Sequence, residues 1–147
     1  MGELLTGRRM LVVEDEMLIV LTIEDMLGDL GCKSVTAAST VEKAVSLIGG
    51  QAFDAAMLDM NLKGKSSRPV ADTLVAHGVP FIVCTGNTGD VWDGFRDHAI
   101  LRKPFDEAAL VAQLARLLPR EKKDVTDRVN AGPTLQGPAI VAPFTRA

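Results

Sequence analysis

Short apolar runs and helix-type segments alternate five times along this chain, and this alternation restricts its fold more than any other feature. The first run, Met10–Val13, is rich in β-branched residues and uninterrupted, which is typical of a strand buried on both faces. The other predicted strands cover residues 32–38, 53–59, 80–86 and 99–104. Strands that alternate with helices form a parallel sheet with helices on both faces. The sequence therefore predicts an α/β protein with a doubly wound, five-stranded parallel sheet.

The predicted helices follow from apolar periodicity and from capping residues. In the first helix the apolar face consists of Leu18, Leu21, Ile23, Met26, Leu27 and Leu30, and Gly31 ends it. Ser39 and Glu42 have the spacing of a capping box at the start of the second helix. Residues 68–78 form the third helix, and Asp106 caps the last helix, which runs to residue 118.

The segment 87–98, "NTGDVWDGFRDH", departs from this regularity. Two glycines, three aspartates and an asparagine give it a low helix propensity, so the fourth helix is predicted to be short or irregular. Trp92 and Phe95 lie within it. The sequence leaves two alternatives open for these rings: they fold back onto the domain, or they form an exposed contact for a partner.

Composition excludes several classes of protein. The chain has 147 residues, of which 47% are hydrophobic and 24% charged, as in a globular domain. A net charge of −3 gives no reason to expect direct nucleic-acid binding. No apolar run approaches the roughly 20 residues that cross a membrane. Cys32 and Cys84 form no disulfide framework or metal-binding pattern, so we expect a reducing, cytoplasmic environment.

Residues 119–147 differ in composition from the preceding chain. They contain four prolines and lack a helical or strand period, although "AIVAPF" at 139–144 is apolar. We therefore expect one domain over residues 1–118 and an extended C-terminal tail over 119–147, with no output domain.

Polar residues with metal-binding or phosphate-binding chemistry end four of the predicted strands. Glu14 and Asp15 follow the first strand, Asp59 ends the third, Thr85 lies at the end of the fourth, and Lys103 follows the fifth. Ligands of an open parallel sheet bind at the carboxyl ends of its strands. The adjacent acids Glu14, Asp15 and Glu16 repel one another and have no basic neighbour in sequence. Carboxylate oxygens suit a hard divalent cation, and Mg²⁺ is the simplest candidate.

These residues resemble the bacterial response-regulator receiver domain of two-component signalling. The resemblance covers residues 8–118 and rests on the acidic pair, Asp59, Thr85 and Lys103-Pro104, in this order and each at a strand end. It implies a flavodoxin-like (βα)5 fold and a stand-alone signalling protein rather than an enzyme. "PFIVCTGN" and "AILRKPF" are similar to the alphaproteobacterial "FAT GUY" subgroup of receivers, which is associated with HWE-type sensor kinases.

The resemblance also implies a metal site. Asp15 and Asp59 would bind Mg²⁺ directly, Glu14 would act through a water molecule, and the backbone carbonyl of Asn61 would complete the protein ligands.

A phosphoryl site is implied by the same resemblance, with Asp59 as the acceptor. The Thr85 hydroxyl would bind a phosphoryl oxygen and Lys103 would pair with the phosphoryl charge, while the backbone N–H groups of Met60 and Gly86 would bind the remaining oxygens. Pro104 would fix the backbone after Lys103, through a cis bond as one option.

The implied partners are a sensor histidine kinase or a phosphotransfer protein, and a downstream protein whose contacts change on phosphorylation. A homodimer is one option that the sequence leaves open.

Several features depart from an ordinary receiver and keep other functions open. The spacings from Asp59 to Thr85 and from Thr85 to Lys103 are short, and Ile100 stands where many receivers carry an aromatic switch residue. A phosphorylation-independent adaptor with the same fold is therefore one alternative. An aspartyl-phosphate phosphohydrolase is another, although such enzymes generally carry a second carboxylate where this chain has Asn61.

Overall fold

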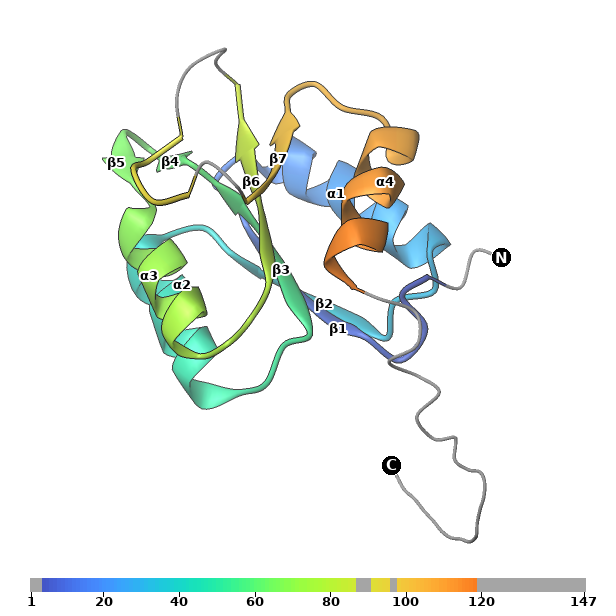
Figure 1. Cartoon of the computed structure of the whole chain (residues 1–147), viewed down its shortest axis with the longest axis horizontal. Helices are drawn as coiled ribbons and strands as arrows, with labels where there is room; N and C mark the ends of the chain where they lie inside the picture. The colour runs from blue at the N-terminus through green and yellow to red at the C-terminus, as the bar shows by residue number, and fades with distance from the viewer. Residues whose placement is uncertain (1–3, 87–90, 96–97, 119–147) are drawn as a thin grey trace, which may run out of the picture. The chain divides into compact units, whose positions relative to one another are not determined.

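A computed structural model describes residues 4–86, 91–95 and 98–118, and its main feature is a five-stranded parallel sheet (Figure 1). The strands are β1 (Arg9–Val13), β2 (Ser34–Ala38), β3 (Ala55–Asp59), β6 (Phe81–Thr85) and β7 (Ala99–Arg102). Their order across the sheet is β2-β1-β3-β6-β7, and all neighbours are parallel. Because the order of winding reverses between β1 and β3, the carboxyl ends of these two strands border the crevice where such sheets bind ligands.

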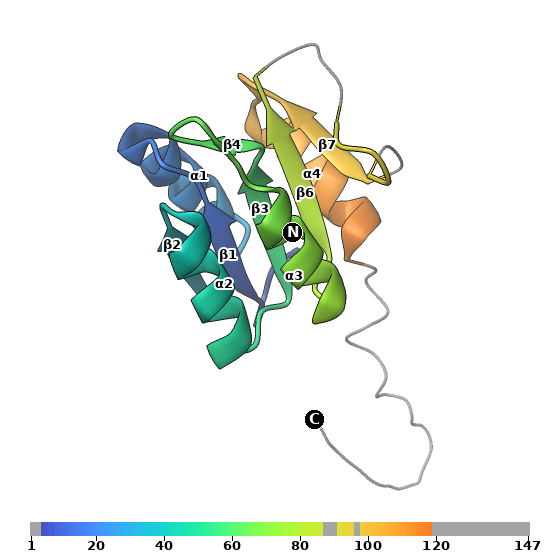
Figure 2. The same cartoon turned by 90° about the vertical axis from the view of Figure 1, so that its left-hand side faces the viewer.

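Helices cover both faces of this sheet. The described helices are α1 (Met17–Asp29), α2 (Val41–Gly50), α3 (Arg68–Ala76) and α4 (Glu107–Leu117). α1 and α4 lie on one face, and α2 and α3 lie on the other (Figure 1). Figure 2 shows α2 and α3 on the near side of the sheet. The predicted doubly wound, flavodoxin-like fold is therefore confirmed.

The central strands are buried on both faces, as their uninterrupted apolar sequences predict. Met10 to Val13 in β1 and all five residues of β6 are buried, as are the first four residues of β3. An apolar residue at each position suits a strand that has helices on both sides. Apart from the exposed Arg9 at the start of β1, polar residues appear only where these strands end, so the packing of the sheet fixes where Glu14, Asp59 and Thr85 lie.

The predicted N-cap residue is correct for α4 and wrong for α2. The Asp106 carboxylate accepts a hydrogen bond from Ala109 N–H at 2.9 Å, so Asp106 caps α4 as predicted. The capping box predicted at Ser39 is wrong: Thr40 is the N-cap of α2, and its hydroxyl accepts from Lys43 N–H at 3.1 Å. The helix begins one residue later than the spacing of Ser39 and Glu42 indicated.

The predicted apolar face of α1 is only partly correct. Ile23 and Leu27 are buried as expected, together with Val20, but Leu18 is 79% exposed and Leu21 49% exposed. α1 carries apolar residues on two sides, and only the side with the spacing of Val20, Ile23 and Leu27 meets the sheet. Leu18, Leu21 and Met17 therefore form an exposed apolar surface at the start of α1.

No helix is present in the described residues between β6 and β7, which are 86, 91–95 and 98. Turns form there instead, with Phe95 N–H bonded to the Trp92 carbonyl and His98 N–H to the Phe95 carbonyl. Phe95 is buried and Trp92 packs against the core. Of the two alternatives for these rings, the structure favours folding back onto the domain. The rest of the predicted segment, residues 87–90 and 96–97, lies outside the described residues.

A small antiparallel hairpin between β3 and α3 was not predicted. It consists of β4 (Asn61–Leu62) and β5 (Lys65–Ser66), and its turn has positive φ at Lys63 (53°) and Gly64 (84°). Positive φ at both central residues is the geometry of a tight hairpin turn. This hairpin lies immediately after Asp59, at the carboxyl edge of the sheet.

The predicted tail, residues 119–147, lies outside the described part of the chain.

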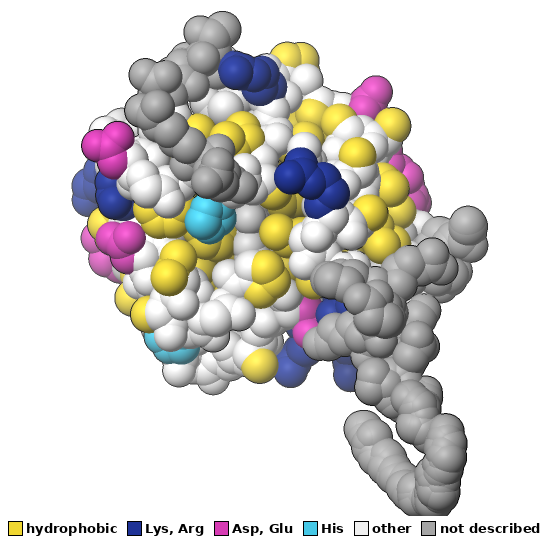
Figure 3. All heavy atoms as spheres, viewed as in Figure 1, with side chains coloured by type: hydrophobic (Ala, Val, Ile, Leu, Met, Phe, Trp, Pro, Cys, Tyr) yellow, Lys and Arg dark blue, Asp and Glu magenta, His cyan; other side chains and the backbone are white. Residues whose placement is uncertain are grey.

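Within the described residues, no helix has the length and apolar character that crossing a membrane requires. On the face drawn in Figure 3, the coloured Lys and Arg side chains are scattered among hydrophobic and uncharged groups.

Candidate functional site

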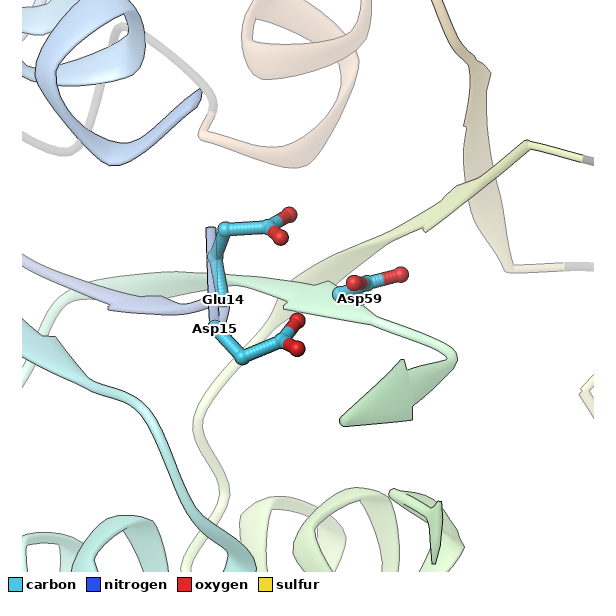
Figure 4. Close-up of side chains that lie close together, drawn as sticks. All are labelled: Glu14, Asp15 and Asp59. Atoms are coloured by element: carbon cyan, nitrogen blue, oxygen red, sulfur yellow. The ribbon is translucent and has the colours of Figure 1, made fainter. Parts of the chain in front are cut away.

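Three carboxylates meet at the carboxyl edge of the sheet. Glu14 and Asp15 follow β1, Asp59 ends β3, and one oxygen from each lies within 4.8 Å of the others. Figure 4 shows the Glu14 and Asp15 side chains reaching from the end of β1 toward the side of Asp59. Parallel pairing of β1 with β3 brings them together, because Val13 is in register with Leu58, directly before Asp59. The predicted convergence of these residues is therefore present.

Lys103 supplies a positive charge to this cluster. Its ammonium Nζ lies 3.0 Å from Glu14 Oε1 and 3.3 Å from Asp59 Oδ1. The Glu14 side chain is 3% exposed, so its charge has little access to water. Three carboxylates and one ammonium leave two negative charges, which matches one divalent cation. The acidic residues have no basic neighbour in sequence, and Lys103, which follows the edge strand β7, supplies part of their counter-charge.

The pKa of Asp59 is raised from 3.8 to about 6, and burial is the largest cause. The negative charge of Glu14 also acts upward, while the charge and hydrogen bond of Lys103 act in the opposite direction. A backbone hydrogen bond from Asn61 N–H to the Asp59 carboxylate also lowers the pKa. Asp59 is therefore anionic at neutral pH, but it holds its proton more tightly than an exposed aspartate does.

Burial lowers the pKa of Lys103, but its hydrogen bond to Glu14 and the charge of Asp59 outweigh this, and the net direction is upward. Lys103 thus remains an ammonium group at neutral pH. Its backbone is fixed as well, because Lys103 N–H donates to the Thr85 carbonyl at 2.8 Å. The Lys103–Pro104 peptide bond is cis.

Thr85 ends β6, next to the strand that carries Asp59. Asp59 pairs with Cys84 in the register of β3 and β6, so Thr85 lies one residue beyond it. Thr85 is 5% exposed, and the following residue, Gly86, is exposed. Both residues are therefore at the same edge as the carboxylates, where the sequence predicted them.

Backbone groups from the segment after β3 complete the site. Asn61 N–H donates to the Asp59 carboxylate, and Lys63 N–H, in the hairpin turn, donates to Asp15 Oδ2 at 3.1 Å. Met60 N–H, which the resemblance assigned to a phosphoryl oxygen, instead donates to the Cys84 carbonyl at 3.2 Å. It is held within the sheet, and the Asn61 N–H is the amide that faces the Asp59 carboxylate.

Sequence reasoning missed Ser67, which is completely buried. Its hydroxyl lies within hydrogen-bonding distance of the carbonyls of Asp59 and Met60, and it is the N-cap residue of α3. Its place directly before the predicted helix at residue 68 was the only signal in the sequence. Lys63 carried no such signal, since its contribution comes from its backbone.

The residues of this site fit a Mg²⁺ ion. All three side chains are hard oxygen donors, they lie close enough to share one cation, and the cluster has the complementary charge. Both oxygens of Glu14 already have partners, Lys103 and Glu16 N–H. Glu14 is therefore less suited to direct binding of the cation than Asp15, whose contact with Lys63 N–H involves Oδ2.

Comparisons with solved structures give close matches to small signalling domains. The solution structure of SdrG from Sphingomonas melonis Fr1 is 40% identical, covers 78% of this chain and 98% of that chain, and has a TM-score of 0.70. The BeF3-activated conformation of SdrG from Pseudomonas melonis Fr1 is also 40% identical, with coverage of 75% and 95% and a TM-score of 0.67.

A third match is the receiver domain of the sensor histidine kinase PA1611 from Pseudomonas aeruginosa PAO1, with a magnesium ion coordinated in its active site cleft. It is 30% identical, covers 77% of this chain and 98% of that chain, and has a TM-score of 0.65. No curated protein matches this chain. The family model of the response regulator receiver domain matches residues 10–115, which include every residue of the site described above. The chain therefore belongs to the response-regulator receiver domain family.

Proposed function

We propose that this protein is a single-domain response regulator that accepts a phosphoryl group on Asp59 in a Mg²⁺-dependent reaction. The observation that carries this proposal is the placement of Lys103, 3.3 Å from Asp59 Oδ1, within a cluster of three carboxylates. The magnesium ion reported for the PA1611 receiver domain and the BeF3-activated conformation of SdrG support the same chemistry here.

In the proposed reaction an Asp59 carboxylate oxygen attacks the phosphorus of a phosphohistidine. A P–O bond forms, the P–N bond breaks, and the imidazole leaves with the electron pair and takes up a proton. Lys103 offsets the charge on the incoming phosphoryl oxygens, and the Asn61 N–H restrains the carboxylate. Mg²⁺, held by Asp15, Asp59 and the Asn61 carbonyl with Glu14 acting through water, would offset the remaining negative charge.

Phosphorylation would then change protein contacts near Thr85 and Lys103. The Thr85 hydroxyl and Gly86 N–H would bind phosphoryl oxygens, and both residues lie where β6 ends and the segment toward β7 begins. Ile100 is aliphatic and packs against the core, so ring rotation at this position cannot act as the toggle. We infer that the described turn residues 91–95 and 98 respond instead.

The phosphoryl donor would be a sensor histidine kinase, of HWE type if the subgroup resemblance holds, or a phosphotransfer protein. The exposed apolar surface of Met17, Leu18 and Leu21 begins directly after the acidic residues 14–16, and it suits a protein partner that reaches Asp59. We assign the phosphoryl chemistry to residues 1–118 and an accessory role in association to residues 119–147. Partners of this kind would place the protein in the cytoplasm.

Labelling by a small acyl-phosphate donor tests the proposal. Asp59→Asn should abolish Mg²⁺-dependent labelling, because it removes the nucleophilic carboxylate. Asp72→Asn is the matched control, since Asp72 is an exposed aspartate on α3 that forms an ion pair with Arg68. Labelling that persists in Asp59→Asn would reject Asp59 as the acceptor.

The same assay separates the alternatives. A phosphorylation-independent adaptor would show no labelling of the unmodified protein. A phosphohydrolase would release inorganic phosphate from phosphomonoesters over many turnovers, which a receiver domain would not do.

A further inference from the structure

The segment between β3 and α3 supplies the site with backbone groups rather than side chains. Asn61 N–H donates to the Asp59 carboxylate, and Lys63 N–H donates to Asp15 Oδ2. Both donors belong to the hairpin of β4 and β5 or to its turn. The orientation of this short hairpin therefore restrains two of the three carboxylates of the site.

Ser67 fixes the two peptide groups that precede this hairpin. The Met60 carbonyl accepts hydrogen bonds from Ser67 N–H and from the Ser67 hydroxyl, both at 2.9 Å. The Asp59 carbonyl lies within hydrogen-bonding distance of the same hydroxyl. A hydroxyl has one proton, so the two carbonyls share a single donor. Ser67 is the only buried serine among the residues that the structure describes.

Because a peptide group is planar, fixing the Met60 carbonyl also fixes the direction of the Asn61 N–H toward the Asp59 carboxylate. The Met60 carbonyl and the Asn61 N–H belong to one trans peptide group and point in opposite directions. Because Ser67 holds the carbonyl on one side, the N–H must point to the other side, where the Asp59 carboxylate lies. The preceding peptide group is held in the same way: its carbonyl faces Ser67, and its Met60 N–H donates to the Cys84 carbonyl at 3.2 Å.

We propose that Ser67 is a positioning residue for the phosphoryl-accepting site: its buried hydroxyl sets the Met60–Asn61 peptide group, which aims Asn61 N–H at the Asp59 carboxylate. Ser67 does not touch the reacting atoms. It also begins α3, so it connects this helix to the carboxylate. The part of this inference that concerns phosphorylation rests on the proposed function.

Ser67→Ala is the first test, with Mg²⁺ alone as the probe. The variant removes the hydroxyl donor from both carbonyls and leaves the Met60 carbonyl with the backbone N–H of residue 67 alone, so the Met60–Asn61 peptide group should be held less firmly. We expect the Mg²⁺ dissociation constant to rise about five- to tenfold, in line with the loss of one buried hydrogen bond. Exchange of the Asn61 amide should accelerate by a similar factor relative to that of Leu11 in β1, which reports on the stability of the whole domain.

Three further variants isolate the hydrogen bond from packing. Ser67→Cys conserves volume but is a poor donor, so it should behave like Ser67→Ala. Ser67→Thr retains the hydroxyl and should restore Mg²⁺ affinity to within about twofold of the unmodified protein. Ser66→Ala is the matched control, because the exposed Ser66 hydroxyl contacts Arg68 N–H at the start of α3 and neither of the two carbonyls.

The outcomes distinguish this inference from the proposed function. Unchanged Mg²⁺ affinity and unchanged relative exchange of Asn61 in folded Ser67→Ala would overturn the positioning role. Equal acceleration of Asn61 and Leu11 would also overturn it, since that result indicates a purely structural residue. If the Mg²⁺ and exchange effects appear but the unmodified protein accepts no phosphoryl group, the positioning role stands and the proposed function fails.

Discussion

The two segments that leave the central strands on either side of the site are held in different ways. After β3, residues 60–67 are tied by directional hydrogen bonds from Ser67, Asn61 and Lys63. After β6, in addition to two backbone hydrogen bonds in turns, the described residues 91–95 and 98 have ring contacts. These contacts pair Phe95 with Phe81, Trp92 and His98 at centroid distances of 6.0, 5.6 and 4.9 Å.

This difference has a mechanical consequence. A hydrogen bond to a buried carbonyl or carboxylate weakens steeply with small rotations, so the segment after β3 keeps one geometry. Contacts between aromatic rings tolerate a range of distances and tilts with little loss of energy. We therefore expect the segment after β3 to hold the cation and the nucleophile, and the segment after β6 to change with phosphorylation.

The largest effect is expected from Asp15→Asn. The substitution removes one charged ligand but retains an oxygen that accepts from Lys63 N–H, so the hairpin should stay in place. Mg²⁺ affinity should fall at least about 100-fold, because the affinity of such sites depends on the charge of their ligands. Without Mg²⁺ the variant should be at least as stable as the unmodified protein, since repulsion among the carboxylates decreases.

Titration calorimetry with MgCl₂ measures this loss, and Glu16→Gln is the control. Glu16 is the third acid of the same sequence cluster, but it is exposed and outside the group of three carboxylates. An affinity loss in Glu16→Gln as large as that in Asp15→Asn would mean that overall negative charge, rather than the geometry of the site, attracts the cation.

The sequence predicted one of these two segments much less well than the other. Poor helix propensity in residues 87–98 correctly indicated that the described part after β6 forms no helix. The hairpin after β3 was missed because strands of two residues have no detectable period, and because Lys63 adopts a positive φ that its side chain does not favour. Ser67 was missed because a serine before a helix is ordinarily an exposed cap.

The strand ends, in contrast, were predictable from the sequence. Residues such as Glu14, Asp59 and Thr85 each follow an uninterrupted apolar run, and parallel topology brings the ends of such runs to one edge. Sequence periodicity failed for α1, where Leu18 and Leu21 continue an apolar stripe beyond the part that meets the sheet. Which side of a doubly apolar helix is buried depends on the tertiary structure.

A smaller effect is expected on stability as a function of pH in the absence of Mg²⁺. Burial raises the pKa of Asp59 from 3.8 to about 6. The folded protein thus binds this proton more tightly than the unfolded chain does, and the resulting stabilisation is complete below about pH 4. It is lost as the pH rises through about 6. After allowance for solvent screening, the loss amounts to about 1–2 kcal/mol.

Asp59→Asn should therefore be more stable than the unmodified protein by about 1–2 kcal/mol at pH 7.5 in EDTA, and the difference should shrink toward pH 4. Urea denaturation at both pH values measures it. A difference that stays constant with pH would show that the substitution acts through packing, and that the hydrogen bonds after β3 already compensate for the buried charge.

The smallest effect is expected from Arg68→Met, which loosens only the segment after β6. The Arg68 guanidinium lies over the Phe95 ring, with Cζ 5.4 Å from the ring centroid. Loss of this cation–π contact should reduce the free energy of unfolding by about 0.5 kcal/mol. Trp92 packs edge-on against Phe95 and is the only tryptophan, so its fluorescence should shift. Mg²⁺ affinity should remain within about twofold, because the Arg68 side chain contacts Phe95 and Asp72 rather than the carboxylates of the site.

Two control variants separate the cation–π contact of Arg68 from its ion pair. Arg68→Lys keeps a cation and should retain most of the Trp92 signal, whereas Asp72→Asn removes the exposed ion pair of Arg68 and should leave that signal unchanged. Arg68 is also the residue after Ser67, so the variant tests whether the two segments are independent. The contrary outcome is that Arg68→Met weakens Mg²⁺ binding as much as Ser67→Ala does. The ring contacts and the hydrogen bonds would then be coupled through the start of α3. In that case the segment after β3 and the segment after β6 would not have separate roles.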